Sequence, residues 1–183
     1  MVLLNSPIRD QDKVMPSFEL MNIDGTVLKS SELVGKSGTL IMFICNHCPY
    51  VKAIINKIVE TTNELEKFKI KSIAIMPNDT DKYPEDSFEN MKFFSIKHQF
   101  KFPYLIDKTQ EVSKNFGAVC TPDFFGFNSD NKLSYRGRIG LMKNLDFIGK
   151  TNDLLNAMKQ ISKTGQGPKE QFSSAGCSIK WKN

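Results

Sequence analysis

Hydrophobic residues occur along this chain in two patterns, continuous runs and helical repeats. The segment GTLIMFIC (38–45) is a continuous apolar run, which is typical of a strand buried on both faces of a sheet. After it, apolar residues from Val51 to Leu65 recur at helical spacing, and Pro49 suits the first turn because its missing N–H is not needed there. The run KIKSIAIM (69–76) predicts the next strand. This order predicts a right-handed βαβ unit with parallel strands.

Weaker patterns surround this unit, and we expect one α/β domain over residues 1–183. Residues 18–33 alternate around Asp24-Gly25, which predicts a β-hairpin followed by a short helical turn at Ser30 or Ser31. The remaining predicted elements are a helix beginning at Pro84, Glu85 and Asp86, a short strand at 103–107, a short helix stopped at Gly117, paired strands at 123–128 and 132–138, and a closing helix at 151–161. The tail, residues 165–183, reads as loop-like.

Composition and charge narrow the classes of function. Of the 183 residues, 40% are hydrophobic and 25% are charged, and the net charge of +5 comes from scattered lysines rather than a basic patch. We therefore expect no nucleic-acid partner. Apolar runs are all shorter than a membrane span, and the start MVLLNSPIRDQDK has no basic region ahead of its apolar residues. We therefore expect no membrane partner and a cytoplasmic location.

Two of the four cysteines form the motif CNHCPY (45–50), where the buried strand meets the helix. We expect Cys45 just before the helix and Cys48 in its first turn, so that both sulfurs come together. Unpaired N–H groups and the helix dipole favour a thiolate at Cys45, which can attack a substrate disulfide before Cys48 resolves the mixed disulfide. We expect Cys45 to be the exposed, low-pKa thiol and Cys48 the buried one. A cationic His47 between them would stabilise the Cys45 thiolate further.

Four cysteines are too few for a disulfide-stapled scaffold, and a close pair in a reducing cytosol is more often catalytic or metal-binding. A zinc site needs about four ligands, whereas the only other histidine is His98 and the remaining cysteines stand alone. We therefore expect no metal and no cofactor. A metal-binding or chaperone module using Cys45, His47 and Cys48 is the non-enzymatic alternative.

The segment VCTPDFF (119–125) is a second candidate part of the site. Thr121-Pro122 precedes a strand; a cis bond there would leave the Thr121 backbone able to pair with an extended thiol substrate, and an ordinary trans proline is the alternative. Cys120 should lie near the motif, either as a third redox thiol or as a small buried hydrophobe. Cys177, in the tail, is another possible redox thiol if the tail folds back over the site.

The motifs together resemble a known family along nearly the whole chain. The chain resembles the thioredoxin-like superfamily, and within it the peroxiredoxin-like branch of redoxin domains related to alkyl hydroperoxide reductase and thiol-specific antioxidant proteins. The segments that carry the resemblance are MPSFELMNIDGTVLKSSELVGK, MFICNHCPYVKAI, IMPNDTDKYPEDSFENMKFF, FPYLID, VCTPDFFGFN, LSYRGRI and AGCSIKW. The resemblance implies a thioredoxin-like fold, with a central mixed β-sheet flanked by helices and an N-terminal β-hairpin extension. It also implies Cys45 and Cys48 at the redox position and Pro122 in the slot of that fold's cis-proline.

Three positions depart from the family patterns. Ile44 stands where many thioredoxins have tryptophan, and Thr39 stands where they carry a buried acid that relays protons. Met42 stands where peroxiredoxins have a threonine that binds peroxide oxygens. The last departure argues against efficient peroxide reduction of the usual kind.

The sequence therefore predicts a thiol-disulfide oxidoreductase that uses Cys45 as nucleophile, Cys48 as resolving thiol and His47 as a tuning group, with Thr121 and Pro122 binding substrate. A peroxiredoxin-like thiol peroxidase with antioxidant activity, using Cys45 resolved by Cys48, is the enzymatic alternative. The expected partners are protein or small-molecule disulfides or hydroperoxides, with thioredoxin or glutathione as reductant.

Overall fold

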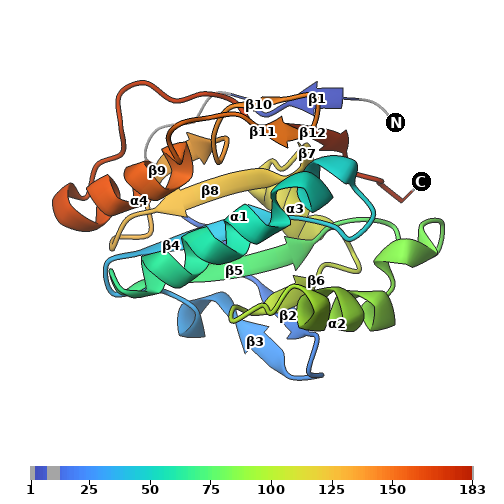
Figure 1. Ribbon diagram of the computed structural model, residues 1–183. Coiled ribbons are helices and arrows are strands. Elements are labelled where there is room, and N and C mark those ends of the chain that lie inside the picture. Colours follow the sequence, from blue (N-terminus) through green and yellow to red (C-terminus); the bar gives the residue numbers. More distant parts are fainter. Residues whose placement is uncertain (1–2, 8–12, 183) are drawn as a thin grey trace.

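A seven-stranded mixed sheet runs through the centre of the molecule in the computed structural model, which describes residues 3–7 and 13–182 (Figure 1). The strand order is β3-β2-β6-β5-β4-β8-β9, and β6, β5 and β4 are parallel, whereas the outer strands pair antiparallel. The strands span Glu19–Asn22 (β2), Val27–Lys29 (β3), Gly38–Phe43 (β4), Ile70–Met76 (β5), Tyr104–Ile106 (β6), Asp123–Phe127 (β8) and Leu133–Gly137 (β9). This mixed sheet is the one that the resemblance implies.

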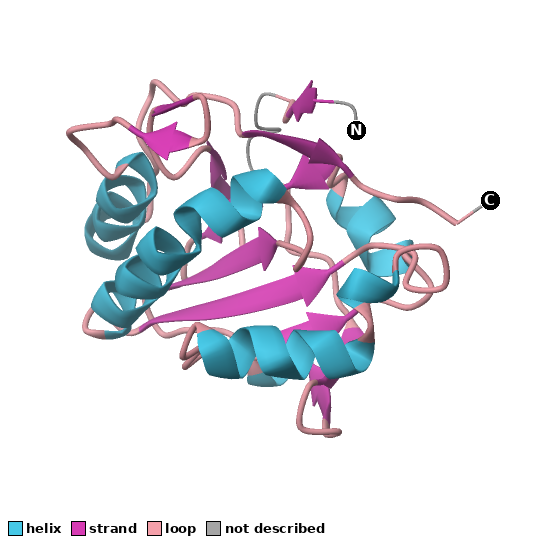
Figure 2. Cartoon of the chain, turned by 45° about the vertical axis from the view of Figure 1, so that its right-hand side comes forward, coloured by secondary structure: helices cyan, strands magenta, loops and turns pink. Residues whose placement is uncertain are grey.

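Helices cover both faces of the sheet. They span Pro49–Glu66 (α1), Phe88–Lys97 (α2), Glu111–Phe116 (α3) and Asp153–Thr164 (α4), with single 3-10 turns at Ser30–Glu32 (η1) and Pro84–Asp86 (η2). Figure 2 shows α1 and α2 side by side across one face. The core cluster on that face also includes α4, and α3 packs into a separate cluster on the other face. Among the described residues, none of the helices combines the length and apolarity needed to span a bilayer.

The sequence of the central strand β4 is continuously apolar because both faces of this strand are buried. Leu40 and Met42 contribute to the cluster under α1, whereas Ile41 and Phe43 contribute to the cluster on the opposite face. All four side chains are fully buried, because successive residues of a strand point to opposite faces and both faces here are covered. The strand then delivers the chain to Cys45, which lies two residues past its end.

Most of the predicted elements are confirmed, including the β2–β3 hairpin, whose turn places Gly25 at φ +88°. The start of α2 is displaced from the prediction. Residues 84–86 form only a 3-10 turn, and the extended Ser87 caps α2 by accepting a hydrogen bond from the Asn90 N–H at 3.4 Å. Because the chain turns before the helix begins, Asp86 points into the protein and is fully buried.

A second, three-stranded sheet joins the two ends of the chain to its middle. It has the order β1-β12-β7, formed by Leu3–Asn5, Ala175–Ser178 and Cys120–Thr121 (Figure 1). Part of the tail that reads as loop-like in the sequence is therefore a strand, and it is the central strand of this sheet. A further hairpin, also absent from the predicted elements, pairs Met142–Lys143 (β10) with Asp146–Phe147 (β11).

Candidate active site

The two cysteines of the motif lie close together at the junction of β4 and α1. Cys48 is the N-cap of α1, with extended backbone angles of φ −63° and ψ 123°, and Pro49 occupies the first helical turn. Cys48 thus lies one position before the turn predicted for it. Hydrogen bonding between the two thiols contributes to the pKa of each, so the sulfurs are neighbours. Both residues are fully buried, and the prediction of an exposed Cys45 is therefore wrong in this structure.

Thr121 contacts both sulfurs of the motif. Its hydroxyl lies 3.2 Å from Cys45 Sγ, and its carbonyl oxygen lies 3.1 Å from Cys48 Sγ. The Thr121-Pro122 peptide bond is cis, as the resemblance implies. The strand β7 therefore brings a hydroxyl to one cysteine and a carbonyl to the other.

The order of the two thiol pKa values is the reverse of the prediction. Burial raises the pKa of Cys45 well above its usual value, and Cys48 and the charge of Asp86 raise it further. The hydrogen bond from Cys45 lowers the pKa of Cys48 to about 5 against its own burial, with help from Cys177 and from backbone N–H groups. The sequence predicts that the helix N-terminus acts on Cys45, whereas in the structure Cys48 is the N-cap of α1. These pKa shifts favour a thiolate on Cys48 over one on Cys45 in the reduced pair.

Thr121 provides a hydrogen-bond partner for both sulfurs when the shared proton lies on Cys48. With the proton on Cys45, the Cys48 thiolate accepts hydrogen bonds from its neighbours. With the proton on Cys48, that thiol donates to the Thr121 carbonyl, and the Thr121 hydroxyl can donate to the Cys45 thiolate. Cys48 is therefore placed to take the proton from Cys45, which would leave the thiolate on Cys45.

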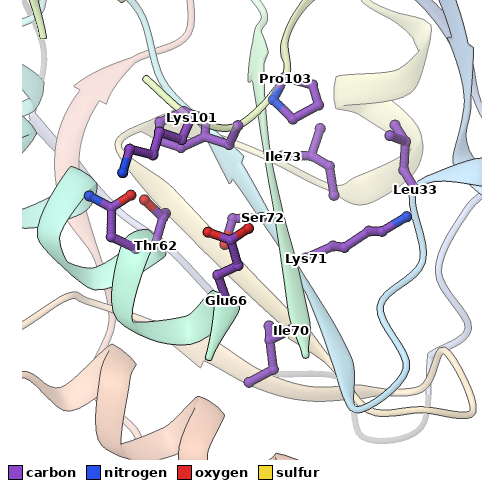
Figure 3. Close-up of a pocket in the computed structure, with 11 residues that line it drawn as sticks. Leu33, Thr62, Glu66, Ile70, Lys71, Ser72, Ile73, Lys101 and Pro103 are labelled. Carbon is purple, nitrogen blue, oxygen red and sulfur yellow. The ribbon is translucent and has the colours of Figure 1, made fainter. Parts of the chain in front are cut away.

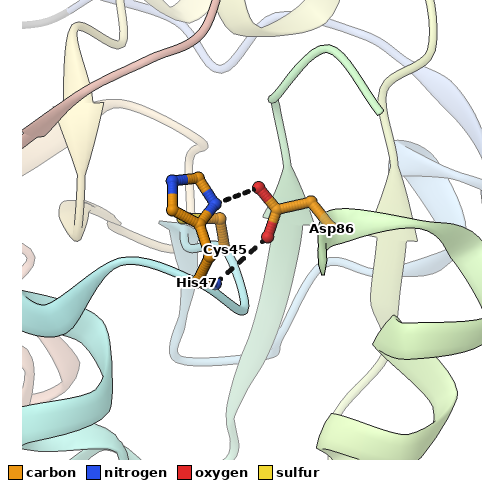
Figure 4. Close-up of side chains that lie close together, drawn as sticks. All are labelled: Cys45, His47 and Asp86. Atoms are coloured by element: carbon orange, nitrogen blue, oxygen red, sulfur yellow. Dashed lines mark hydrogen bonds and ion pairs between the residues drawn. The ribbon is translucent and has the colours of Figure 1, made fainter. Parts of the chain in front are cut away.

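His47 forms an ion pair with a buried aspartate (Figure 4). Its Nδ1 lies 2.6 Å from Asp86 Oδ2, and its ring stacks on Tyr83 with 5.5 Å between centroids. The hydrogen bond to Asp86 raises the pKa of His47. Burial opposes the charge of Asp86, but hydrogen bonds from His47 and Asn78 outweigh it and hold the pKa of Asp86 below its usual range. The imidazolium charge is thus neutralised locally by a carboxylate.

Asp86 also fixes the backbone of the motif, and sequence reasoning missed this role. Its Oδ1 accepts hydrogen bonds from the backbone N–H groups of Asn46 at 2.8 Å and His47 at 3.2 Å. The Asn46 side chain in turn accepts a hydrogen bond from the Tyr104 hydroxyl at 3.0 Å. In the sequence, Asp86 looks like an ordinary acidic residue at a helix start, so the pattern carries no signal of its burial.

One group of side chains has the geometry of a partial metal site. Cys45, His47 and Asp86 offer ligand atoms that all lie within 4.8 Å of one another (Figure 4). Structural zinc takes four protein ligands, and this group supplies three. Moreover, both carboxylate oxygens of Asp86 already accept N–H donors, which a metal ion would have to displace. The arrangement fits a hydrogen-bonded support for the motif better than a metal centre.

The other two cysteines have different surroundings. Cys177 Sγ lies 2.7 Å from Cys48 Sγ, and Cys177 is only 2% exposed. Cys120 is also buried, but its thiol points to the carbonyl of Pro122 at 3.6 Å, and burial raises its pKa. The structure therefore brings Cys177 to the motif, whereas Cys120 is directed toward its own turn.

The backbone edge expected to receive substrate is covered by the tail. In β7, Thr121 is paired with Cys177 of β12, and Thr121 is only 1% exposed. The tail is fastened beyond this point, since the Asp79 N–H donates to the Lys180 carbonyl and the Lys180 N–H donates to the Asn78 side chain. A substrate can pair with Thr121 only after β12 has moved.

Another cavity lies away from the thiols. It has a volume of about 280 Å³ and is lined by residues from α1, the start of β5 and the segment that precedes β6 (Figure 3). Thr62 and Glu66 line it from the helix, and Ile70 and Ser72 line it from the strand. Because β4 and β5 are parallel, this cavity lies near the amino ends of the strands, and Cys45 follows the carboxyl end of β4.

Comparisons with known proteins agree with this geometry. A solved structure of an uncharacterised conserved protein from Geobacillus kaustophilus superposes with a TM-score of 0.94 at 39% identity, covering 100% of this chain and 97% of that one. The thioredoxin domain of a thiol-disulfide oxidoreductase from Bacteroides vulgatus superposes with a TM-score of 0.64 at 13% identity, covering 84% and 99% of the two chains. The fold is therefore thioredoxin-like.

Sequence comparisons give a more distant relative and a family match. The thiol-disulfide oxidoreductase ResA of Bacillus thuringiensis subsp. konkukian is 28% identical over 122 residues, which cover 66% of this chain and 65% of that protein. The alignment thus spans slightly less than two thirds of the length of this relative. Residues 12–136, more than half of the chain, match the AhpC/TSA family. The chain belongs to the AhpC/TSA family.

Proposed function

We propose that this protein is a thiol-disulfide oxidoreductase whose redox pair is Cys45 and Cys48. The observation that carries the proposal is the pair of neighbouring thiols at the junction of β4 and α1, both contacted by Thr121. The similarity to ResA, which is named for this activity, supports the same chemistry. The substrate class is a protein or small-molecule disulfide, with thioredoxin or glutathione as the candidate reductant.

The proposed reaction gives each sulfur a role. Cys48 accepts the proton of Cys45, and the Cys45 thiolate then attacks one sulfur of the substrate disulfide and releases the other as a thiolate. Cys48 next gives its proton to the substrate thiolate released first and attacks Cys45 Sγ in the mixed disulfide, which forms the Cys45–Cys48 bond and releases the second substrate sulfur as a thiolate. The Thr121 hydroxyl stabilises the Cys45 thiolate, and the Thr121 carbonyl holds the proton on Cys48.

His47 acts as a positioning residue in this scheme. Its charge is balanced by Asp86, and the same carboxylate binds the backbone N–H groups between the two cysteines. Substrate access is the second requirement, because neither cysteine is exposed. We therefore assign the approach to Cys45 to a state in which β12 has shifted from β7.

The test is the reduction of a small peptide disulfide by the purified, reduced protein. Cys45→Ser should lower the rate by about 10³-fold or more, because the attacking atom is removed. Cys48→Ser should accumulate a mixed disulfide between Cys45 and the peptide, visible by mass spectrometry. Cys120→Ser is the matched control, since it removes an equally buried thiol that points away, and it should keep the wild-type rate. Equal rates for wild type and Cys45→Ser would refute the proposal.

A thiol peroxidase is the second candidate, favoured by the family match and by the Thr121 hydroxyl beside Cys45. In that reaction Cys45 would reduce a hydroperoxide and become a sulfenic acid, which Cys48 would convert to a disulfide with loss of water. Met42 argues against it, since a thioether cannot donate a hydrogen bond to peroxide oxygen. Consumption of hydroperoxide that depends on Cys45, at a rate above that with the peptide disulfide, would favour the peroxidase.

A further inference from the structure

The third sulfur, Cys177, lies against the resolving cysteine rather than against the rest of the tail. Its Sγ is 2.7 Å from Cys48 Sγ, although 129 positions separate the two residues in sequence. A disulfide bond is about 2.05 Å long, so less than about 1 Å of movement would join them. Cys48 therefore has two thiol neighbours, Cys45 within the motif and Cys177 from the tail.

The backbone of β12 holds Cys177 in this position. Cys177 is the register partner of Thr121 in β7 on one side and of Leu3 in β1 on the other. Gly176 permits the close approach of β12, because a Cβ there would lie 2.3 Å from the Thr121 carbonyl oxygen. The thiol is thus presented on a strand that occupies the edge beside Thr121-Pro122, where an extended substrate would otherwise pair.

The protonation states suit a transfer between these sulfurs. Burial and the neighbouring Cys48 together raise the pKa of Cys177 to about 12, although the Lys180 ammonium lowers it. When Cys48 is bonded to Cys45 it carries no negative charge, so its contribution to the pKa of Cys177 disappears. Oxidation of the motif therefore makes Cys177 easier to ionise, at the moment when Cys48 becomes an electrophile.

We propose that Cys177 is a third redox thiol, which receives the disulfide from the Cys45–Cys48 pair; the inference rests on the function proposed above. Cys177 Sγ attacks Cys48 Sγ, the Cys48–Cys177 bond forms, and the Cys45–Cys48 bond breaks. The proton that leaves Cys177 ends on Cys45. The step is an isomerisation of one disulfide among three sulfurs, so it needs no oxidant beyond the substrate disulfide already consumed.

This transfer has a structural consequence. It returns Cys45 to the reduced state while the oxidising equivalents stay in a bond between α1 and β12. That bond ties the tail to the start of the helix and holds β12 over Thr121. With the third thiol, the sulfur that attacks the substrate is Cys45, whereas the disulfide that the reductant finally opens is Cys48–Cys177.

The test follows the two linkages in time. Reduced wild-type protein is mixed with one equivalent of peptide disulfide, quenched in acid, alkylated, digested without reduction and mapped by mass spectrometry. The Cys45–Cys48 linkage should appear first and decay into Cys48–Cys177, which should reach more than half of the oxidised chains. Cys177→Ser should stop at Cys45–Cys48, and Cys45→Ser treated with oxidised glutathione should form only Cys48–Cys177. The control Cys120→Ser should follow the wild-type time course.

The outcomes separate this inference from the proposed function. If the wild type reduces the peptide but forms only Cys45–Cys48 at every time, the relay is wrong and the oxidoreductase stands. The same holds if Cys48–Cys177 appears in Cys45→Ser alone. If neither wild type nor Cys177→Ser forms Cys45–Cys48 and the peptide stays oxidised, the proposed function itself fails.

Discussion

His47 lies in the motif, but its ring binds the carboxylate of Asp86 instead of acting on the sulfur of Cys45. From the sequence alone, His47 is expected to be a lone cation that stabilises the Cys45 thiolate. In the structure the negative charge of Asp86 offsets the imidazolium, and that same charge raises the pKa of Cys45. The His47–Asp86 pair therefore contributes mainly by fixing the loop that carries the cysteines, since Asp86 also binds two backbone N–H groups there.

This assignment predicts the titration of both histidines. The chain contains only His47 and His98, so their imidazole proton signals are easily assigned by NMR with His98→Gln. The midpoint of His47 should lie above the usual histidine value because of the hydrogen bond to Asp86. The midpoint of His98 should lie below it, because burial and the charge of Lys97 disfavour the imidazolium.

Asp86→Asn is the discriminating variant. The asparagine keeps the shape but loses the charge, so the midpoint of His47 should fall toward its usual range while that of His98 stays unchanged. The rate of peptide-disulfide reduction should fall as well, because an amide binds the backbone N–H groups more weakly than a carboxylate does. A His47 midpoint that is the same in wild type and Asp86→Asn would contradict the ion pair.

For single residues, the sequence predicts which side chains carry the chemistry better than it predicts their burial and protonation. The spacing of Cys45 and Cys48 brings the sulfurs together because strand and helix meet between them. Their pKa order does not follow from spacing alone, since besides the hydrogen bond between the two thiols it depends on burial by distant segments and on Cys177. The role of Asp86 is not predictable from the sequence for the same reason. Asp86 is buried against the motif only because a turn 40 residues away directs its side chain there.

The strand β12 is the element that decides access to the thiols. Its contact with β7 depends on Gly176, since a methyl group there would collide with the carbonyl carbon and oxygen of Thr121. Gly176→Ala should therefore push β12 away from β7 and separate Cys177 from Cys48. We expect a loss of about 1–3 kcal/mol in the free energy of unfolding, as for other overpacked sites, and faster alkylation of Cys177 in the folded protein.

Ala175→Ser supplies the control for this prediction. Residue 175 is the exposed neighbour on the same strand, so the added oxygen meets solvent and should leave both measurements near wild type. Urea denaturation gives the stability, and mass spectrometry after timed alkylation gives the reactivity of each cysteine. If Gly176→Ala protects Cys177 as well as the wild type does, β12 is not held by this close approach.

The elements that sequence reasoning found and missed differ in how their stability arises. Long patterns such as 38–45 and the helix from Val51 to Leu65 are predicted correctly, because the burial of the strand is visible in its continuous apolar run and that of the helix in its periodicity. The tail strand AGCS has a glycine, a serine and no alternation, and it exists only because β1 and β7 supply partners from distant parts of the chain. Such a strand is stabilised by tertiary pairing and leaves little local signal.

The whole molecule couples the state of the thiols to its stability. The two hydrophobic clusters pack on opposite faces of the sheet, and the cluster under α1 includes Cys45, Cys48 and Cys177. A negatively charged sulfur in that cluster therefore lies inside the core. The stability of the core then depends on whether the fold supplies hydrogen-bond donors to that sulfur. Cys48, at the helix N-terminus, has such donors, whereas burial dominates at Cys45.

The pH dependence of stability tests where that charge lies. In the folded, reduced protein the Cys48 thiol ionises near its pKa of about 5, whereas in the unfolded chain it stays protonated up to about pH 8.5. Unfolding between these values takes up a proton, so stability rises with pH across the window by up to about 1 kcal/mol per pH unit and is lost as pH falls through 5. The raised pKa values of Cys45 and Cys177 act only above this window, where they lower stability.

Urea denaturation of Cys48→Ser should lack the rise of stability with pH, and that of Cys120→Ser should keep it, because Cys120 is protonated in both states throughout the window. Contributions from His47 and Asp86 are common to all three chains, so parallel curves for wild type and Cys48→Ser would mean that the thiolate does not reside on Cys48.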